Sequence, residues 1–306
     1  MLASPRRPLL VQLVVTRRCN LTCAYCSEYD TSSSPVDASA LVARVDHAAS
    51  LGTLVLTVTG GEPLLHPEVD RIVERAAHHG MVCTMISNGY ALTRPWIERL
   101  NAARLSVLQM SIDNMEPDDY SQKSWSKIRK KLELLREHAT FAVTINAVLG
   151  SSTLEQTRRV VAGVREMGFY MTVGLMHDER GQVTPGLLED SLAATYREMQ
   201  AASRKTVFHR SGEGWEDAML RDGAAPFKCR AGGRYLYVDE QGAVSYCSQR
   251  RGEPGIDFLS YTPEHVAREF YTPKGCEAQC TIGCVRRASA FDSWRTQSVA
   301  RHSGVR

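Results

Sequence analysis

The strongest constraint on the fold is a regular alternation of β-type runs with amphipathic helical stretches. Six short apolar runs have the pattern of buried strands, at 9–15, 53–59, 81–86, 105–112, 141–149 and 170–176. Helical periodicity separates them and follows the last, at 38–50, 69–79, 95–102, 121–138, 154–167 and 187–202. Strands that alternate with helices pair in parallel, because each helix returns the chain to the same end of the sheet. We therefore predict an α/β fold, a partial (β/α)6 TIM-like barrel rather than a closed eight-fold one.

The pattern changes near residue 226, where helical periodicity fades and cysteine, glycine and short β-type runs take over. Runs at 234–238 and 243–246 flank the turn Glu240-Gln241-Gly242, which predicts a β-hairpin. We expect a barrel over 1–205, a linker over 206–225, and a small cysteine-rich β-hairpin/α domain over 226–306.

The charges are almost balanced, with 37 basic and 34 acidic residues and a formal net charge of +3. This balance gives no reason to expect a nucleic-acid partner. No apolar run approaches the length of a membrane span, and the N-terminus lacks the long apolar core of a secretory signal. We therefore expect a cytoplasmic protein with no membrane span.

Eight of the nine cysteines fall into groups, at 19/23/26, at 229/247 and at 276/280/284. Disulfides are disfavoured in a reducing compartment, so grouped cysteines point to metal. Cys83 stands alone in the apolar run 81–86 and is expected to be a small buried side chain.

The first group places Cys19, Cys23 and Cys26 within eight residues. Three thiolates at this spacing can hold three irons of a [4Fe–4S] cube on one loop. The fourth iron would lack a protein ligand, and an open metal position is a place for chemistry.

Polar or glycine-rich groups also follow the predicted strands. These are Thr59-Gly60-Gly61-Glu62-Pro63, Ser87-Asn88-Gly89, Ser111-Ile112-Asp113, Asn146 and His177-Asp178-Glu179. The carboxyl ends of parallel strands meet at one face, where the active sites of such folds lie.

The cysteine loop, the Gly60-Gly61-Glu62-Pro63 run and the order of six strand–helix units resemble the radical S-adenosylmethionine (SAM) superfamily over roughly 10–200. The resemblance implies that the three cysteines hold a [4Fe–4S] cluster whose open iron takes the amino and carboxylate groups of SAM. It implies cofactor contacts from Tyr25, Gly60, Gly61, Glu62, Pro63, Ser87, Asn88, Ser111 and Asn146. Asn146 is equally well interpreted as a polar residue at a strand end.

In this family Glu62, or the backbone beside it, would accept from the SAM ammonium, and Tyr25 would border the adenine. Gly60 and Gly61 would let the backbone approach the ligand closely. The family cleaves SAM reductively to methionine and a 5′-deoxyadenosyl radical, which abstracts hydrogen from substrate. A flavodoxin- or ferredoxin-type protein would donate the electron. Asp113, His177 and Asp178 are candidates to face substrate, although His177 and Asp178 fit a solvated loop equally well.

The C-terminal cysteines resemble the SPASM/twitch extension, which carries auxiliary iron–sulfur clusters. Cys229, Gly242 and Cys247 match its hairpin half, and Cys276, Cys280 and Cys284 follow. Five cysteines exceed the four that one auxiliary [4Fe–4S] cluster needs. We expect Cys229, Cys247, Cys276 and Cys280 as ligands, with Cys284 as the fifth candidate; a structural zinc site is the alternative.

The resemblance leaves several reactions open. We favour hydrogen abstraction from a small-molecule biosynthetic substrate, with an oxidative outcome. The alternatives are radical adenosyl addition to an isoprenoid, as in adenosylhopane synthase, and modification of a ribosomal peptide. We expect no leader-binding module in the short segment before Cys19, and a separate protein could supply one. A non-enzymatic metal-binding module is the alternative of a different class.

Overall fold

The computed structural model describes residues 7–183, 190–202 and 214–291. Within these ranges nine strands form one sheet in the order β6-β5-β4-β3-β2-β1-β7-β8-β9. The first six strands pair in parallel, each beside its predecessor in the chain. They are β1 (Leu10–Thr16), β2 (Val55–Gly60), β3 (Val82–Ser87), β4 (Val107–Ser111), β5 (Ala142–Leu149) and β6 (Tyr170–Leu175). The predicted α/β partial barrel is confirmed.

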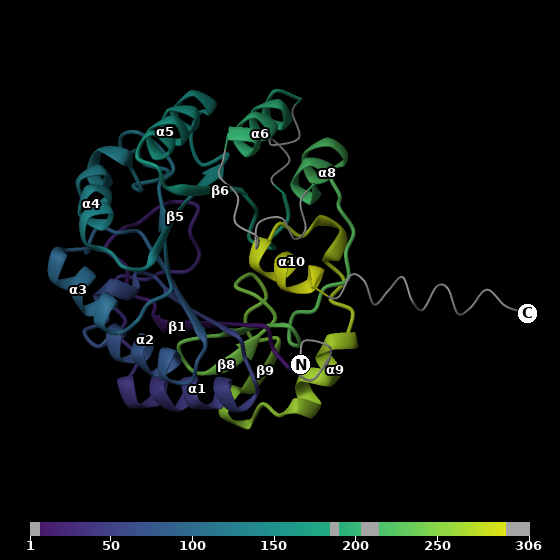
Figure 1. Ribbon diagram of the computed structural model, residues 1–306. Helices are drawn as coiled ribbons and strands as arrows, with labels where there is room; N and C mark the ends of the chain where they lie inside the picture. Colours follow the sequence, from purple (N-terminus) through teal and green to yellow (C-terminus); the bar gives the residue numbers. More distant parts are fainter. Residues whose placement is uncertain (1–6, 184–189, 203–213, 292–306) are drawn as a thin grey trace, which may run out of the picture.

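Helices cross over between these strands and cover the outer side of the curved sheet (Figure 1). They are α1 (Ala38–Ser50), α2 (Val69–His78), α3 (Arg94–Ala102), α4 (Trp125–His138), α5 (Leu154–Glu166) and, after β6, α6 (Asp190–Ala202). Side-chain oxygens cap the first turns of three of them, from Asp37, Thr93 and Thr153. Residues 187–189 of the predicted last helix lie outside the described residues.

The two faces of the sheet differ in character, because successive strand residues point to opposite sides. The helix-facing side is apolar and supplies the main core, with Val11, Leu13, Leu56, Val58, Met85, Leu108, Ile145 and Val173 among its members. Cys83 belongs to this core, which confirms its predicted burial, and burial raises the pKa of its thiol to about 12.

The C-terminal part extends the same sheet. Strand β7 (Tyr235–Val238) pairs in parallel with β1, while β8 (Ala243–Ser245) and β9 (Pro254–Asp257) continue antiparallel. The predicted hairpin is confirmed, and it is joined to the barrel by backbone hydrogen bonds between β1 and β7. The remaining helices of the described residues are α8 (Trp215–Asp222), α9 (Pro263–Tyr271) and α10 (Gly283–Ala290), with short 3₁₀ turns η1 (Pro63–Leu65), η3 (Phe258–Ser260) and η4 (Glu277–Gln279).

Helix α8 lies inside the predicted linker 206–225 and packs against α6. Residues 206–213 of that linker lie outside the described residues, and the division into domains stays a prediction. In the described ranges, no helix combines the length and apolar character needed to cross a bilayer.

Candidate functional site

The loop that carries Cys19, Cys23 and Cys26 leaves the carboxyl end of β1. It is closed at its base by two backbone hydrogen bonds, from Cys19 to the Asp30 carbonyl (2.9 Å) and from Asp30 to the Arg17 carbonyl (2.8 Å). The Cys26 amide donates to the Cys23 carbonyl at 3.1 Å, which tightens the turn between these two cysteines. All three cysteines line one cavity of about 210 Å³.

Nitrogen donors surround two of these sulfurs. The Leu21 amide donates to Cys19 Sγ at 3.4 Å, and the Gln122 amide donates to Cys23 Sγ at 3.3 Å. Asn88 Nδ2 lies 3.6 Å from Cys19 Sγ. Such donors stabilise negative charge on sulfur, as the thiolate ligands of an iron–sulfur cluster require. Burial raises the pKa of Cys19 to about 11, so that metal binding there would release a proton. These residues fit a cluster held by three thiolates.

The cavity brings together five of the predicted cofactor residues, namely Gly60, Gly61, Ser87, Asn88 and Ser111. It also contains polar residues that were not among the predicted site residues, namely Gln12, Glu28, Tyr29, Lys123 and Ser248. They come from β1, the cysteine loop, the loop before α4 and the segment after β8. No local motif marks them, because only the fold brings these segments together.

Gly60 and Gly61 contact the backbone that leads into the cysteine loop. Gly60 has φ of +146°, and a Cβ there would lie 2.0 Å from the Thr16 carbonyl oxygen. A Cβ on Gly61 would lie 2.3 Å from the Arg17 carbonyl oxygen. Glycine is therefore required here by packing inside the protein, in addition to the predicted approach to a ligand.

Glu62 is fully buried and accepts three hydrogen bonds from the protein. They come from the Leu64 amide (3.0 Å), the Ser87 hydroxyl (2.7 Å) and the Asn88 amide (2.7 Å). Burial raises the pKa of this carboxyl, and the three donors oppose the shift. Glu62 thus joins η1 to the end of β3, and neither it nor Pro63 lines the cavity. Direct contact of Glu62 with SAM stays a prediction.

Asp113 is buried and positions Tyr25. Its carboxylate accepts from Tyr25 Oη at 2.6 Å, from Ser121 Oγ at 2.7 Å and from the Val148 amide at 3.1 Å. Lys123 Nζ donates to the same Tyr25 oxygen at 2.8 Å. Asp113 therefore ties the ends of β4 and β5 to the cysteine loop. Asp113 does not line the cavity, and its contact with substrate stays a prediction.

His177 and Asp178 lie in a turn after β6. The Asp178 carboxylate accepts from the amides of Arg180 and Gln182, both at 2.9 Å, and so caps this turn. Neither His177 nor Asp178 lines the cavity, and their contact with substrate stays a prediction. Asn146 lies beside Ser111 on the neighbouring strand and accepts from Thr172 Oγ1 at 2.8 Å.

The five C-terminal cysteines come from four segments. Cys229 precedes β7, Cys247 follows β8, Cys276 and Cys280 flank η4, and Cys284 lies in α10. Cys229, Cys247 and Cys280 are buried in one cluster with three tyrosines, and Cys284 packs against it. Burial raises the pKa of Cys229 to about 11 and of Cys247 and Cys280 to about 12. Among the described residues, no three His, Cys, Asp or Glu side chains converge as ligands of a single metal ion.

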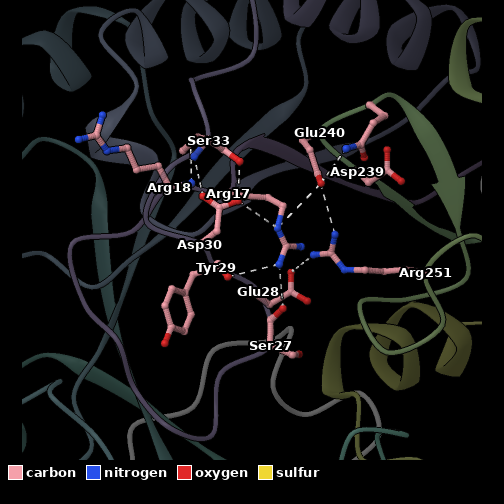
Figure 2. A network of polar contacts seen from close by, with 12 residues as sticks. Arg17, Arg18, Ser27, Glu28, Tyr29, Asp30, Ser33, Asp239, Glu240 and Arg251 are labelled. Atoms are coloured by element: carbon pink, nitrogen blue, oxygen red, sulfur yellow. Dashed lines mark hydrogen bonds and ion pairs between the residues drawn. The ribbon is translucent and has the colours of Figure 1, made fainter.

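A network of polar contacts joins the cysteine loop to the hairpin (Figure 2). Arg251 donates to Glu28 at 2.9 Å and to the Tyr237 hydroxyl at 2.6 Å, and pairs with Glu240 at 3.3 Å. Arg17 approaches Glu240 from the other side, at 3.9 Å. Since Glu28 also lines the cavity, the network connects the wall of the site to the C-terminal part.

The partial barrel and the three-cysteine cavity are the features expected of the radical SAM superfamily, and comparison with known proteins points to the same family. A sequence profile of the radical SAM superfamily matches residues 13–168. The chain belongs to the radical SAM superfamily. Enzymes of this family use a [4Fe–4S] cluster together with SAM.

Two curated relatives show the likeness in sequence. The AdoMet-dependent heme synthase of Methanosarcina barkeri is 29% identical over 67% of this chain. The PqqA peptide cyclase of Xanthomonas euvesicatoria is 27% identical over 88% of it. The chain spans 62% of the length of each relative.

A solved structure shows the likeness in fold. Streptococcus suis SuiB bound to its precursor peptide SuiA superimposes with a TM-score of 0.67 at 15% identity. The match covers 92% of this chain and 72% of SuiB.

Proposed function

We propose that this chain holds a [4Fe–4S] cluster on Cys19, Cys23 and Cys26, cleaves SAM reductively beside it, and acts on a peptide. One observation carries the first two parts. The three cysteines share a cavity with Gly60, Gly61, Ser87, Asn88 and Ser111, and protein nitrogens already donate to two of the sulfurs.

When bound, the cluster supplies one electron to the sulfonium of SAM, which leaves methionine and a 5′-deoxyadenosyl radical for hydrogen abstraction. The residues of the chain hold the reactants and exclude water. Asp113 and Lys123 orient Tyr25 at one side of the cysteine loop. Asn88 reaches Asn20 at 2.8 Å as well as Cys19, and so orders the loop against β3.

The comparisons move the favoured substrate from a small molecule to a peptide. The PqqA cyclase acts on a peptide according to its name, and SuiB was solved with a precursor peptide. The PqqA cyclase also matches far more of this chain than the heme synthase does. A small-molecule substrate stays the second candidate, supported by the heme synthase.

We also propose one auxiliary [4Fe–4S] cluster on Cys229, Cys247, Cys276 and Cys280. A zinc ion needs four sulfurs about 2.3 Å from one point, whereas a cube binds each thiolate at a separate iron. Cys229, Cys247 and Cys280 are buried in one cluster and Cys276 lies near enough to Cys229 to affect its charge, which supports a shared cluster on these four thiols. Cys284 already has a partner, since its thiol donates to Gln12 Oε1 at 3.8 Å.

The test is anaerobic reconstitution followed by SAM turnover with dithionite as reductant. We expect iron and acid-labile sulfide at roughly eight each per chain, for two cubes. A paramagnetic signal that shifts when SAM is added, together with release of 5′-deoxyadenosine, would support the proposal. A signal that ignores SAM, or a protein that takes up zinc and no iron, would refute it.

A further inference from the structure

The concave side of the sheet, opposite the helices, carries rows of uncharged polar side chains beside apolar ones such as Val14 and Ile86. Strand pairing sets them side by side: Gln12, Thr57 and Thr84 in one row, Gln109 and Thr144 in a second, and Ser111, Asn146 and Thr172 in a third. Two contacts confirm that neighbours share this face. Thr57 Oγ1 lies 2.7 Å from Thr84 Oγ1, and Thr172 Oγ1 donates to Asn146 Oδ1 at 2.8 Å.

These rows are continuous with the cysteine cavity. Ser111 lines the cavity and pairs with Asn146 on β5. Ile86 lines it as well and pairs with Gln109 on β4. The polar rows therefore form the floor beyond the site where SAM is proposed to bind.

No acidic, basic or histidine residue occurs in any of the strands β1 to β6. Among the described residues that line the cavity, the charged side chains are Glu28 and Lys123. A charged substrate group that entered the concave side would lose water and find no opposite charge on these strands, which disfavours it.

Some of this hydrogen-bonding capacity is unused inside the protein. The half-buried Gln109 amide has no hydrogen-bond partner among the described residues, and Asn146 Nδ2 has none. An apolar ligand would strip water from these groups without replacing its hydrogen bonds, which is unfavourable. A ligand with amide or hydroxyl groups would satisfy them.

We propose that Gln109, Thr144, Asn146 and Thr172 select a peptide whose residue at the reacting position is uncharged and hydrogen-bonding, such as Asn, Gln, Ser or Thr. The inference rests on the proposed function and adds the substrate class that the barrel accepts. It disfavours an isoprenoid, which would leave this polar lining unsatisfied.

The test uses the reconstituted full chain with SAM and acetyl- and amide-capped pentapeptides that bear a photo-crosslinker. The central residue is Asn, Ser, Leu or Asp, and farnesol serves as the isoprenoid competitor. We expect the Asn and Ser peptides to crosslink to β4 and β5 about tenfold more than the Leu and Asp peptides. Farnesol should not compete.

Gln109→Leu keeps the size of the side chain and removes its amide, so the preference for Asn and Ser should fall about tenfold. Gln109→Asn should restore part of it. The matched control is Gln241→Leu in the exposed hairpin turn, which should keep the full preference. Equal labelling by the Leu peptide, competition by farnesol, or an unchanged preference in Gln109→Leu would overturn the inference.

Release of 5′-deoxyadenosine in the absence of peptide distinguishes failure of the proposed function from failure of the substrate inference alone. If wild-type protein releases none, the proposed function fails. If wild type and Gln109→Leu both release it, but no peptide labels β4 or β5 in preference to another, only the substrate inference fails.

Discussion

The two groups of cysteines are assembled in different ways. Cys19, Cys23 and Cys26 lie on one loop, which two backbone hydrogen bonds close at its base. Cys229, Cys247, Cys276 and Cys280 come from three segments, which only the β7–β8 hairpin and its packing against α10 bring together. The first group lies on one continuous segment, which Asn88 and Gln122 hold in place from β3 and the loop before α4, whereas the second group depends on several segments of the C-terminal part.

Strand β1 connects the two groups of cysteines. Gln12 lines the first cavity, and its Oε1 accepts from the Tyr235 hydroxyl and the Cys284 thiol. The parallel pairing of β1 with β7 holds the first cavity and the C-terminal cysteines at a set separation through backbone hydrogen bonds. We therefore predict that a substitution in one group of cysteines removes the proposed cluster of that group and leaves the cluster of the other group in place.

The largest effect is expected at the first group. Cys23→Ala removes one of three ligands of the proposed catalytic cluster, so release of 5′-deoxyadenosine should fall to background. Iron content should drop by about four per chain, the content of one cube. Cys83→Ala is the matched control, because that thiol faces the helices, and it should keep both iron and cleavage. Persistent cleavage in Cys23→Ala would refute the assignment.

The second group should separate binding of the auxiliary cluster from SAM cleavage. Cys247→Ala is expected to lower iron from about eight to about four per chain, again the content of one cube. Peptide-independent release of 5′-deoxyadenosine should continue, because Cys247 does not line the first cavity. Unchanged iron content in Cys247→Ala would contradict the proposed ligand set. Cys284→Ala tests whether Cys284 is the cysteine that does not bind the auxiliary cluster, in which case the iron content should not change.

A smaller effect is expected where the two regions are joined. Arg251→Met removes the cationic partner of Glu28, whose carboxylate in the cavity wall then keeps the hydrogen bond from the Tyr237 hydroxyl. Loss of one partner from a part-buried network should lower the free energy of unfolding by about 1–3 kcal/mol. Urea unfolding measures this, and a double-mutant cycle with Glu28→Gln isolates the pair. An additive cycle would mean that the two side chains do not interact.

The smallest effect is expected on the outer surface. The hydrogen bond from Arg75, at 2.5 Å, is the main reason that the pKa of Asp46 lies below its usual value. A lowered pKa stabilises the fold above the pKa of the unfolded state, and this stability is lost as the pH falls through the folded value. Asp46→Asn should therefore cost under about 1 kcal/mol at neutral pH and nothing in strong acid, because the pair is exposed. Thermal unfolding of both proteins between neutral pH and strong acid would show whether the stability difference shrinks as the pH falls.

The sequence could predict the barrel because its elements are governed by local patterns. Helix α1 begins and ends at the predicted residues, and the six strands lie within one or two residues of their predicted bounds. Helix α4 begins later than predicted, at Trp125. Ser121 instead donates to Asp113 at the end of β4, and Lys123 donates to Tyr25, which is distant in the chain.

The sequence by itself determined the strand–helix order and the three-cysteine loop, because both depend on residues close together in the chain. Only the tertiary structure decided that Gln12, Glu28 and Lys123 line the cavity, that Asp113 holds Tyr25, and that the hairpin extends the barrel sheet. These contacts join residues up to hundreds of positions apart. Their geometry follows from strand register and packing, which no local spacing encodes.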